Sequence, residues 1–130
     1  MNIVYKGIEF PFRIKDSIKQ RRIKLIKDTY KFYSENPDKV SVDRSGADNY
    51  LCYYKSQNGN KCAIGRYIPD VEYSCNIEGN TAGSIISSLN IHLQKLGSAF
   101  LSDLQSLHDW GFGEDNDKEG KYKRLLNFYK

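Results

Sequence analysis

Apolar and polar residues follow two different periods along the first third of the chain. Apolar residues alternate with polar ones over residues 2–14, on either side of Lys6-Gly7, a pattern typical of two short strands joined by a tight turn. From Ile18 to about Glu35, apolar residues instead recur every three or four positions, which predicts one amphipathic helix. Asp16 or Ser17 stands where the N-cap of this helix is expected.

A second hairpin is expected in the middle of the chain. Residues 50–55 and 61–64 are mostly apolar, and they flank Asn58-Gly59, two residues that readily adopt positive φ angles. The preceding residues, 41–49, are polar and are predicted to form a loop. Residues 65–80 show no clear period, so we expect a loop that includes a short helical turn.

Three further helices are predicted in the second half of the chain. They cover residues 81–96, 98–110 and 122–130. Thr81 and Ser98 are expected to cap the first two, and the Trp-Gly-Phe-Gly sequence at 110–113 is expected to end the second. The order of elements predicts an α+β fold, in which a small antiparallel sheet of two hairpins is covered by three to four helices. We expect a single domain over residues 1–130, with a hairpin and a basic helix in residues 1–40.

Composition narrows the class of protein. The chain has 130 residues, 39% of them hydrophobic, with three prolines and no low-complexity run, which excludes a disordered tail and a collagen-like repeat. No stretch of eighteen apolar residues and no pattern of a secretory signal is present, so the expected location is the cytoplasm. The three cysteines, Cys52, Cys62 and Cys75, are odd in number and form no C-x-x-C pair, so we expect reduced thiols and no metal site.

The positive charge is concentrated in one segment. The formal net charge is +4, and residues 1–40 hold ten Lys or Arg against five Asp or Glu, so the excess belongs to the predicted helix around residues 15–31. Its basic face, Lys24, Lys27 and Lys31, lies opposite the apolar stripe. Such a face is typical of a solvated helix surface, and it could also meet phosphate oxygens or an acidic protein.

Three stretches, 62–70, 73–80 and 100–110, hold polar residues among apolar ones. They resemble a family of small, mostly uncharacterised proteins of phages and bacterial genomes, whose pattern joins Cys-Ala-x-Gly, Pro-Asp, Tyr, Glu-Gly and Leu-Gln-x-x-His-Asp. The matching residues here are Cys62, Gly65, Pro69, Asp70, Tyr73, Glu78, Gly79, Gln105, His108 and Asp109. The resemblance covers about residues 50–112. It implies a shared fold and a phage or mobile-element source, and no established activity.

Physical chemistry offers three interpretations of these residues. In the first, a Cys62 thiolate is the nucleophile and His108 the base, with Asp109, Asp70 or Glu78 orienting it, which requires a partly exposed Cys62 in an electropositive place. Against this, Cys62 lies in an apolar run, where inert buried thiols are usual.

In the second interpretation, Gln105 and His108, three residues apart on one helix face, form a structural clasp that ties loop 65–80 to helix 98–110. Asp70, Glu78 and Asn80 would be the acceptors. In the third, the same groups form a ligand pocket whose residues are Arg66, Asp70, Tyr73, Glu78, Asn80, Gln105, His108 and Asp109.

These observations favour a non-enzymatic binding protein without a cofactor. The resemblance implies that it works in a phage-infected bacterium, where it would inhibit or sequester a host defence component, either a protein or a small phosphorylated, nucleotide-type ligand. Tyrosine-rich strand edges and a short sheet favour a homo-oligomer. Two alternatives remain: a cysteine-dependent hydrolase that uses Cys62 and His108, and a nucleic-acid-binding protein that uses the basic helix 15–31.

Overall fold

A computed structural model describes residues 1–43, 51–114 and 117–130. The chain begins with an antiparallel hairpin of β1 (Val4–Tyr5) and β2 (Ile8–Glu9), in which Val4 lies opposite Glu9. Lys6 and Gly7 both have positive φ angles, 46° and 84°, as a two-residue turn between twisted strands requires. The first predicted hairpin is confirmed.

Helix α1 (Ile18–Glu35) has the predicted bounds because residues next to each end favour the beginning or the end of a helix. Ser17 and Gln20 form a capping box: the Gln20 N–H donates to Ser17 Oγ, and the Ser17 N–H donates to Gln20 Oε1. The helix ends at Asn36, and Pro37 begins the short 3-10 helix η1 (Pro37–Lys39). The buried residues of α1 are Arg21, Leu25, Ile26, Thr29 and Tyr33.

The second hairpin differs from the prediction in its pairing. Strand β4 (Leu51–Cys52) pairs with β3 (Val42–Asp43), not with residues 61–64. The predicted loop 41–49 therefore contains a strand at its start, and residues 44–50 lie outside the described part of the chain. The turn at Gly59 is present, with a φ of 89°. The segments on its two sides pair through one β-bridge, between Lys55 and Lys61, and the chain then enters the 3-10 helix η2 (Gly65–Tyr67).

Close backbone packing explains why residues 61–64 do not continue as a strand. Gly65 lies so near Tyr54 that a Cβ built on it would stand 1.8 Å from the Tyr54 carbonyl oxygen. The segment after the turn thus passes over the carbonyl of Tyr54 and does not run alongside the preceding segment as a paired strand. The Cys62 N–H donates to the Tyr54 carbonyl at 3.4 Å.

The predicted helix 81–96 is divided in the structure into α2 (Ala82–Ile85), the 3-10 helix η4 (Ile86–Ser88) and α3 (Ile91–Gln94). Thr81 caps α2 as predicted. The division occurs because Asn90 acts as a new N-cap: its Oδ1 accepts the Leu93 N–H, and its Nδ2 donates to the Tyr67 carbonyl at 3.1 Å. A further 3-10 turn, η3 (Cys75–Ile77), lies in the preceding loop.

Two predicted boundaries in the last third are wrong. Gly97, not Ser98, is the N-cap residue of α4 (Ser98–Ser106), and residues 110–113 do not end the helix, which continues as the π-helix η5 (Leu107–Glu114). The last helix, α5 (Lys118–Tyr129), begins four residues before the predicted start. Its Leu125, Leu126 and Tyr129 pack against the core, as predicted.

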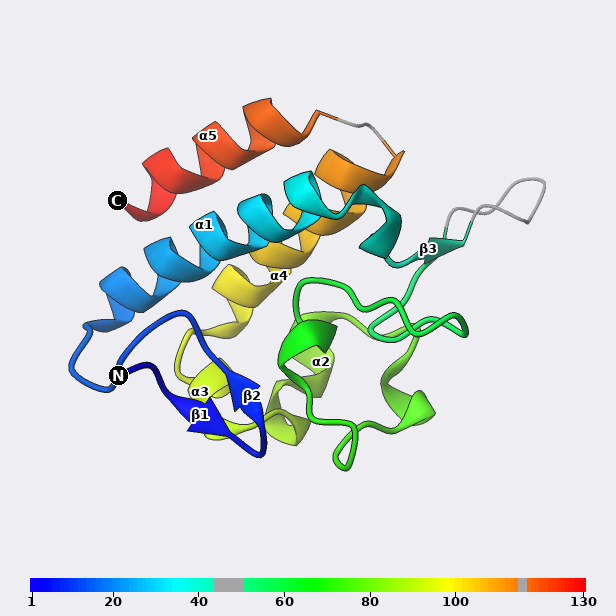
Figure 1. Cartoon of the computed structure of the whole chain (residues 1–130), viewed down its shortest axis with the longest axis horizontal. Helices are drawn as coiled ribbons and strands as arrows, with labels where there is room; N and C mark the ends of the chain where they lie inside the picture. Colours follow the sequence, from blue (N-terminus) through cyan, green and yellow to red (C-terminus); the bar gives the residue numbers. More distant parts are fainter. Residues whose placement is uncertain (44–50, 115–116) are drawn as a thin grey trace.

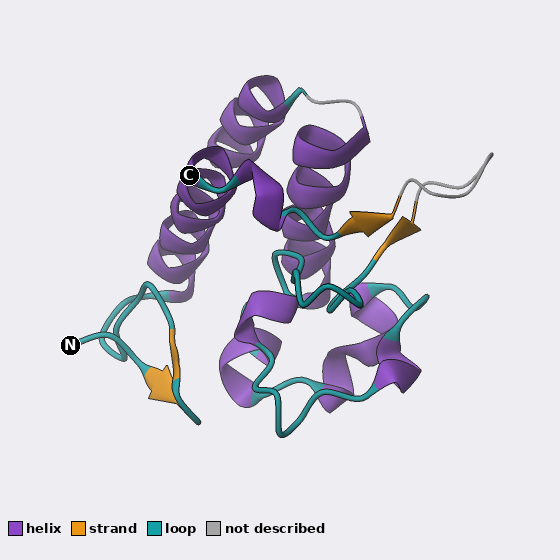
Figure 2. Cartoon of the chain, turned by 45° about the vertical axis from the view of Figure 1, so that its right-hand side comes forward, coloured by secondary structure: helices purple, strands orange, loops and turns teal. Residues whose placement is uncertain are grey.

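The elements form a small α+β fold. Helices α1, α4 and α5 lie together on one side, and the hairpin β1–β2 with the short helices α2 and α3 lies on the other (Figures 1 and 2). The core between them is built from all of these parts, and its fully buried side chains include Phe10, Leu25, Ile64, Phe100 and Leu104. Among the described residues, no helix has the length and apolar character needed to span a membrane.

Candidate functional site: a polar pocket beside helix α4

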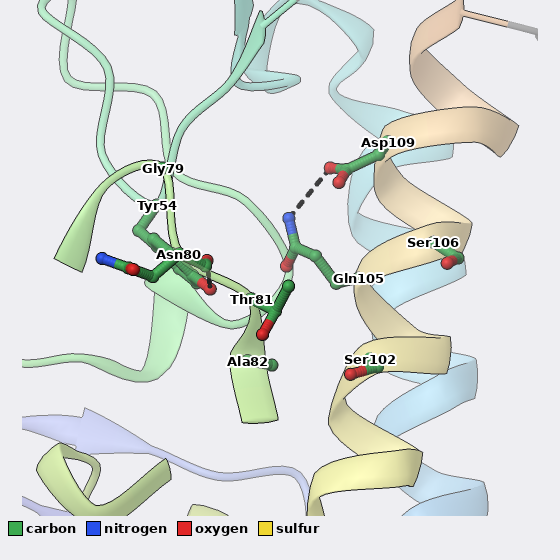
Figure 3. A pocket seen from close by; sticks show the side chains of 9 residues that line it. All are labelled: Tyr54, Gly79, Asn80, Thr81, Ala82, Ser102, Gln105, Ser106 and Asp109. Carbon is green, nitrogen blue, oxygen red and sulfur yellow. Dashed lines mark hydrogen bonds between the residues drawn. The ribbon is translucent and has the colours of Figure 1, made fainter. Parts of the chain in front are cut away.

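A cavity of about 380 Å³ opens between residues 79–82 and helix α4 (Figure 3). Hydrogen-bonding side chains occupy both of its walls. The lining residues are Tyr54, Gly79, Asn80, Thr81, Ala82, Ser102, Gln105, Ser106 and Asp109.

The helix wall follows from residue spacing along α4 and η5. Ser102, Gln105 and Asp109 follow at intervals of three and four residues, which places them on one side of the helix. The neighbouring apolar residues of the helix, Leu101 and Leu104, are completely buried on the core side. The pocket therefore lies against the polar side of an amphipathic helix.

The opposite wall is fixed by local hydrogen bonds. Thr81 caps α2, because its Oγ1 accepts the Ser84 N–H at 3.3 Å. The Tyr54 hydroxyl donates to the Asn80 carbonyl at 2.7 Å, so the chain at residue 80 is tied to the buried ring of Tyr54. The Asn80 side chain points back to its own loop and donates to the carbonyls of residues 76–78.

Gln105, His108 and Asp109 form one hydrogen-bonded network at the edge of the pocket. Asp109 Oδ1 accepts from Gln105 Nε2 at 2.9 Å and lies 2.7 Å from His108 Nδ1 (Figure 3 shows the first contact). His108 Nε2 accepts the Ser41 N–H at 2.9 Å. With Nε2 accepting this N–H, Nδ1 is the ring nitrogen that faces Asp109, and Gln105 and His108 together hold the Asp109 carboxylate in a fixed orientation.

The predicted clasp between His108 and loop 65–80 is not present, because His108 has other partners. His108 is completely buried and lies edge-on to Tyr33 of α1, with ring centroids 4.9 Å apart. It thus joins η5 to α1 and residue 41, not to loop 65–80. Gln105 is the residue that reaches toward that loop, since its Oε1 accepts the Ile64 N–H at 3.4 Å.

The three predicted acceptors of the clasp have other partners. Glu78 accepts the backbone N–H groups of Tyr54 and Lys55 at 2.9 and 3.0 Å. It also accepts the Tyr73 hydroxyl at 2.5 Å, and burial together with this bond raises the pKa of Tyr73 to about 12. The prediction that Glu78 meets His108 is wrong, because its carboxylate is engaged by the backbone of the neighbouring segment.

Asp70 and Asn80 also do not contact His108 in the predicted way. Asp70 is exposed, and Lys61 and Lys55 lower the pKa of its carboxyl from distances of 3.1 and 3.3 Å. Asn80 remains close to the site, since it lines the pocket wall opposite Gln105. Of the predicted ligand residues, Asn80, Gln105 and Asp109 line the pocket.

Arg66 lies in a different environment. It follows Cys62 in a 3-10 turn, forms an ion pair with Asp28 at 3.3 Å, and covers the ring of Phe32 at 3.8 Å from its centroid. It lines a second pocket together with Phe32 and does not line the polar pocket.

Cys62 does not meet the requirement of a nucleophile. Its side chain is completely buried, and burial raises the pKa of its thiol to about 12, so the thiolate is strongly disfavoured. Its Sγ accepts the Gly65 N–H at 3.3 Å. His108, the expected base, already uses Nε2 for the Ser41 N–H. No group of three or more His, Cys, Asp or Glu that could hold a metal occurs among the described residues.

The basic face of α1 is partly neutralised. Lys24 pairs with Asp16 at 2.7 Å, and this bond together with the Arg13 N–H lowers the pKa of Asp16 to about 2. Lys27 and Lys31 are exposed. Lys24 and Lys27 also border a surface groove in which the remaining lining residues are Lys19, Gln20, Ile23 and Lys130.

Sequence reasoning missed Tyr54, Thr81 and Ser102 as pocket residues. Ser102 could have been found, because it stands three residues before Gln105 on the polar side of a leucine-rich helix. Tyr54 and Thr81 come from segments that only the tertiary fold brings to α4. The predicted homo-oligomer, host partner and cytoplasmic location stay predictions.

Comparison of the chain with family models, with curated proteins and with solved structures finds no match, so the resemblance to small phage and bacterial proteins stays a prediction as well.

Proposed function

We propose that this protein is a non-catalytic binding protein that captures a small, uncharged, nucleoside-like molecule in the polar pocket. The observation that carries the proposal is the cavity itself: about 380 Å³, with hydrogen-bonding side chains on both walls and one carboxylate held in place by Gln105 and His108. Small-ligand sites of proteins have volumes of about 300–1,000 Å³ and a few oriented polar groups.

The charge of the lining indicates the kind of ligand. Asp109 is the one ionisable carboxylate among the lining residues, and none of them is a lysine or arginine. The residues that line the pocket thus offer no lysine or arginine to a phosphate group, whereas amino and hydroxyl groups of a nucleoside can donate to Asp109 and Gln105. The phosphorylated end of a nucleotide is therefore not the part that this pocket favours.

Burial of the reactive groups favours binding over catalysis. Cys62 is sealed in the core, and His108 reaches the pocket only through Asp109. In this arrangement His108 orients a carboxylate and does not face a ligand. The π-helical turns of η5 carry His108 and Asp109, and such turns are often found at functional sites.

Isothermal titration calorimetry with adenosine, guanosine, cytidine and uridine tests the proposal. Ser102→Phe fills the pocket from an exposed position, and Ala99→Phe adds the same ring at an exposed position of α4 outside the pocket. We expect saturable binding of at least one nucleoside, weakened about tenfold or more by Ser102→Phe and little changed by Ala99→Phe. Absence of saturable binding, or equal losses in both variants, would overturn the proposal.

A further inference from the structure

A second pocket, of about 170 Å³, lies where the end of α1, the 3-10 helix η1 and the turn at 58–61 meet. It shares no lining residue with the polar pocket and differs from it in charge. Three of its lining side chains are cationic and come from three separate segments. The lining residues are Phe32, Lys39, Asn58, Gly59, Asn60, Lys61 and Arg66.

Hydrogen bonds hold these segments together. The Asn60 side chain donates to the carbonyls of Asp38 and Val40 at 2.7 and 3.2 Å, which ties the turn to η1 and the chain that follows it. The Tyr33 hydroxyl donates to the Lys61 carbonyl and so ties the same turn to α1. The pocket walls are therefore set by the fold before any ligand arrives.

Arg66 is pre-oriented in this pocket. Its guanidinium lies over the Phe32 ring at 3.8 Å, and its side chain is only 19% exposed. Asp28 approaches Nη1 at 3.3 Å, yet this buried atom makes no hydrogen bond within the described part of the chain. A buried guanidinium N–H without an acceptor is costly, and an anionic ligand would supply one.

The two lysines leave the positive charge incompletely balanced. Lys61 pairs with Asp70 at 3.1 Å, but Asp70 is exposed and is shared with Lys55. Lys39 is exposed, and among the residues that the structure describes no carboxylate pairs with it. The lining itself contains three cations and no carboxylate.

We propose that this pocket binds the phosphate group of a small phosphomonoester. A tetrahedral dianion offers several acceptor oxygens, which suits the planar fork of Arg66 and the point charges of Lys39 and Lys61. The volume suits a phosphate group with a short stem, and Arg66 covers one face of the Phe32 ring. The phosphorylated ligand that the sequence suggests thus finds its cations here and not beside His108.

Titrations with inorganic phosphate and with phosphoserine, followed by calorimetry and ³¹P NMR at low ionic strength, test this site. Lys39→Gln removes one exposed cation of the pocket, and Lys31→Gln removes one exposed cation of α1 outside it, so both lower the net charge equally. We expect Lys39→Gln to weaken binding about fivefold or more and Lys31→Gln to change it less than about twofold. Arg66→Lys, which keeps the charge and loses the planar fork, should also weaken binding.

Three outcomes would overturn the proposal. The first is a lack of saturable binding of both probes. The second is an equal effect of Lys39→Gln and Lys31→Gln, which would indicate attraction by net charge alone. The third is tight binding of a duplex DNA fragment with no binding of either monoester, which would indicate a phosphodiester surface such as the basic face of α1. Nucleoside titrations report on the polar pocket separately, because the two pockets share no residue.

Discussion

Replacing His108 with phenylalanine or with alanine separates the hydrogen bonds of the buried imidazole from its packing. The ring is completely buried, accepts the Ser41 N–H at 2.9 Å, lies 2.7 Å from Asp109 and packs edge-on against Tyr33. His108→Phe keeps a ring in the same space but leaves the Ser41 N–H without its acceptor. His108→Ala removes the ring as well.

The structure sets the expected loss in each variant. A buried backbone donor without a partner costs about 1–3 kcal/mol, so His108→Phe should lower the free energy of unfolding by about that amount. Asp109 keeps Gln105 as a donor, so its loss of the His108 bond adds little. The void left by His108→Ala adds about 1–2 kcal/mol at a cavity cost of ~24 cal/mol per Å³. We therefore expect a total loss of about 2–5 kcal/mol for the alanine variant.

Urea denaturation followed by circular dichroism measures both losses, with an unchanged dependence on urea concentration as the sign that the unfolded state is unaffected. In thermal scans each kcal/mol should lower Tm by about 3–5 °C for a domain of this size. A phenylalanine variant within about 0.5 kcal/mol of the parent would refute the role given to the Ser41 N–H bond. Equal stabilities of the two variants would refute the packing role of the ring.

Three further changes test other parts of the structure. Gly65→Ala should cost about 3 kcal/mol or more in urea denaturation, because its Cβ would collide with a backbone carbonyl, whereas Gly83→Ala, whose nearest neighbour would be 3.8 Å away, should be neutral or slightly stabilising; comparable losses would contradict the close approach. Asp16→Asn should lower the urea midpoint at pH 7. Because the folded-state pKa of Asp16 is about 2, below its ordinary 3.8, the difference should be complete above about pH 5 and vanish as pH falls toward 2; a pH-independent difference would exclude the ion pair as its cause. With Cys52 replaced by serine, native protein at pH 8 should react with a thiol reagent at the exposed Cys75, and Cys62 should react only after unfolding; rapid modification of Cys62 would refute its burial.

The elements that were predicted correctly from the sequence are determined by residues within or next to them. The first hairpin depends on Lys6-Gly7, and α1 depends on the Ser17–Gln20 capping box and on the stop before Pro37. Each of these features involves residues within a few positions of one another. No distant segment has to be known for the pattern to be interpreted correctly.

The wrong boundaries depend on contacts with distant segments. Asn90 divides the predicted helix 81–96, and its amide is held by the Tyr67 carbonyl, a contact across 23 residues. Gly111 does not end a helix: a Cβ there would stand 3.3 Å from the Lys118 Cα, so glycine permits close approach of α5 to η5. A glycine that permits helix packing and a glycine that ends a helix look alike in a sequence.

The candidate site was predicted only in part, for a related reason. Gln105, Asp109 and Asn80 line the polar pocket, and the helical spacing of the first two could be seen in the sequence. Glu78 has the same chemistry but serves the N–H groups of residues 54 and 55. The sequence shows which polar side chains a loop contains. Which of them form hydrogen bonds with the backbone depends on the segment that packs beside the loop.

Two residues of the family-like motif, Gly65 and Glu78, help to fix one wall of the polar pocket. Gly65 allows the chain to cross the Tyr54 carbonyl, and Glu78 accepts the Tyr54 N–H. The Tyr54 hydroxyl in turn holds the carbonyl of Asn80 at the pocket wall. These contacts fix the pocket wall opposite α4. Ser102, which is not a residue of the motif, faces that wall from α4. Gly65 and Glu78 thus support one wall of the pocket, whereas Gln105 and Asp109, two further residues of the motif, line the pocket from α4 and η5.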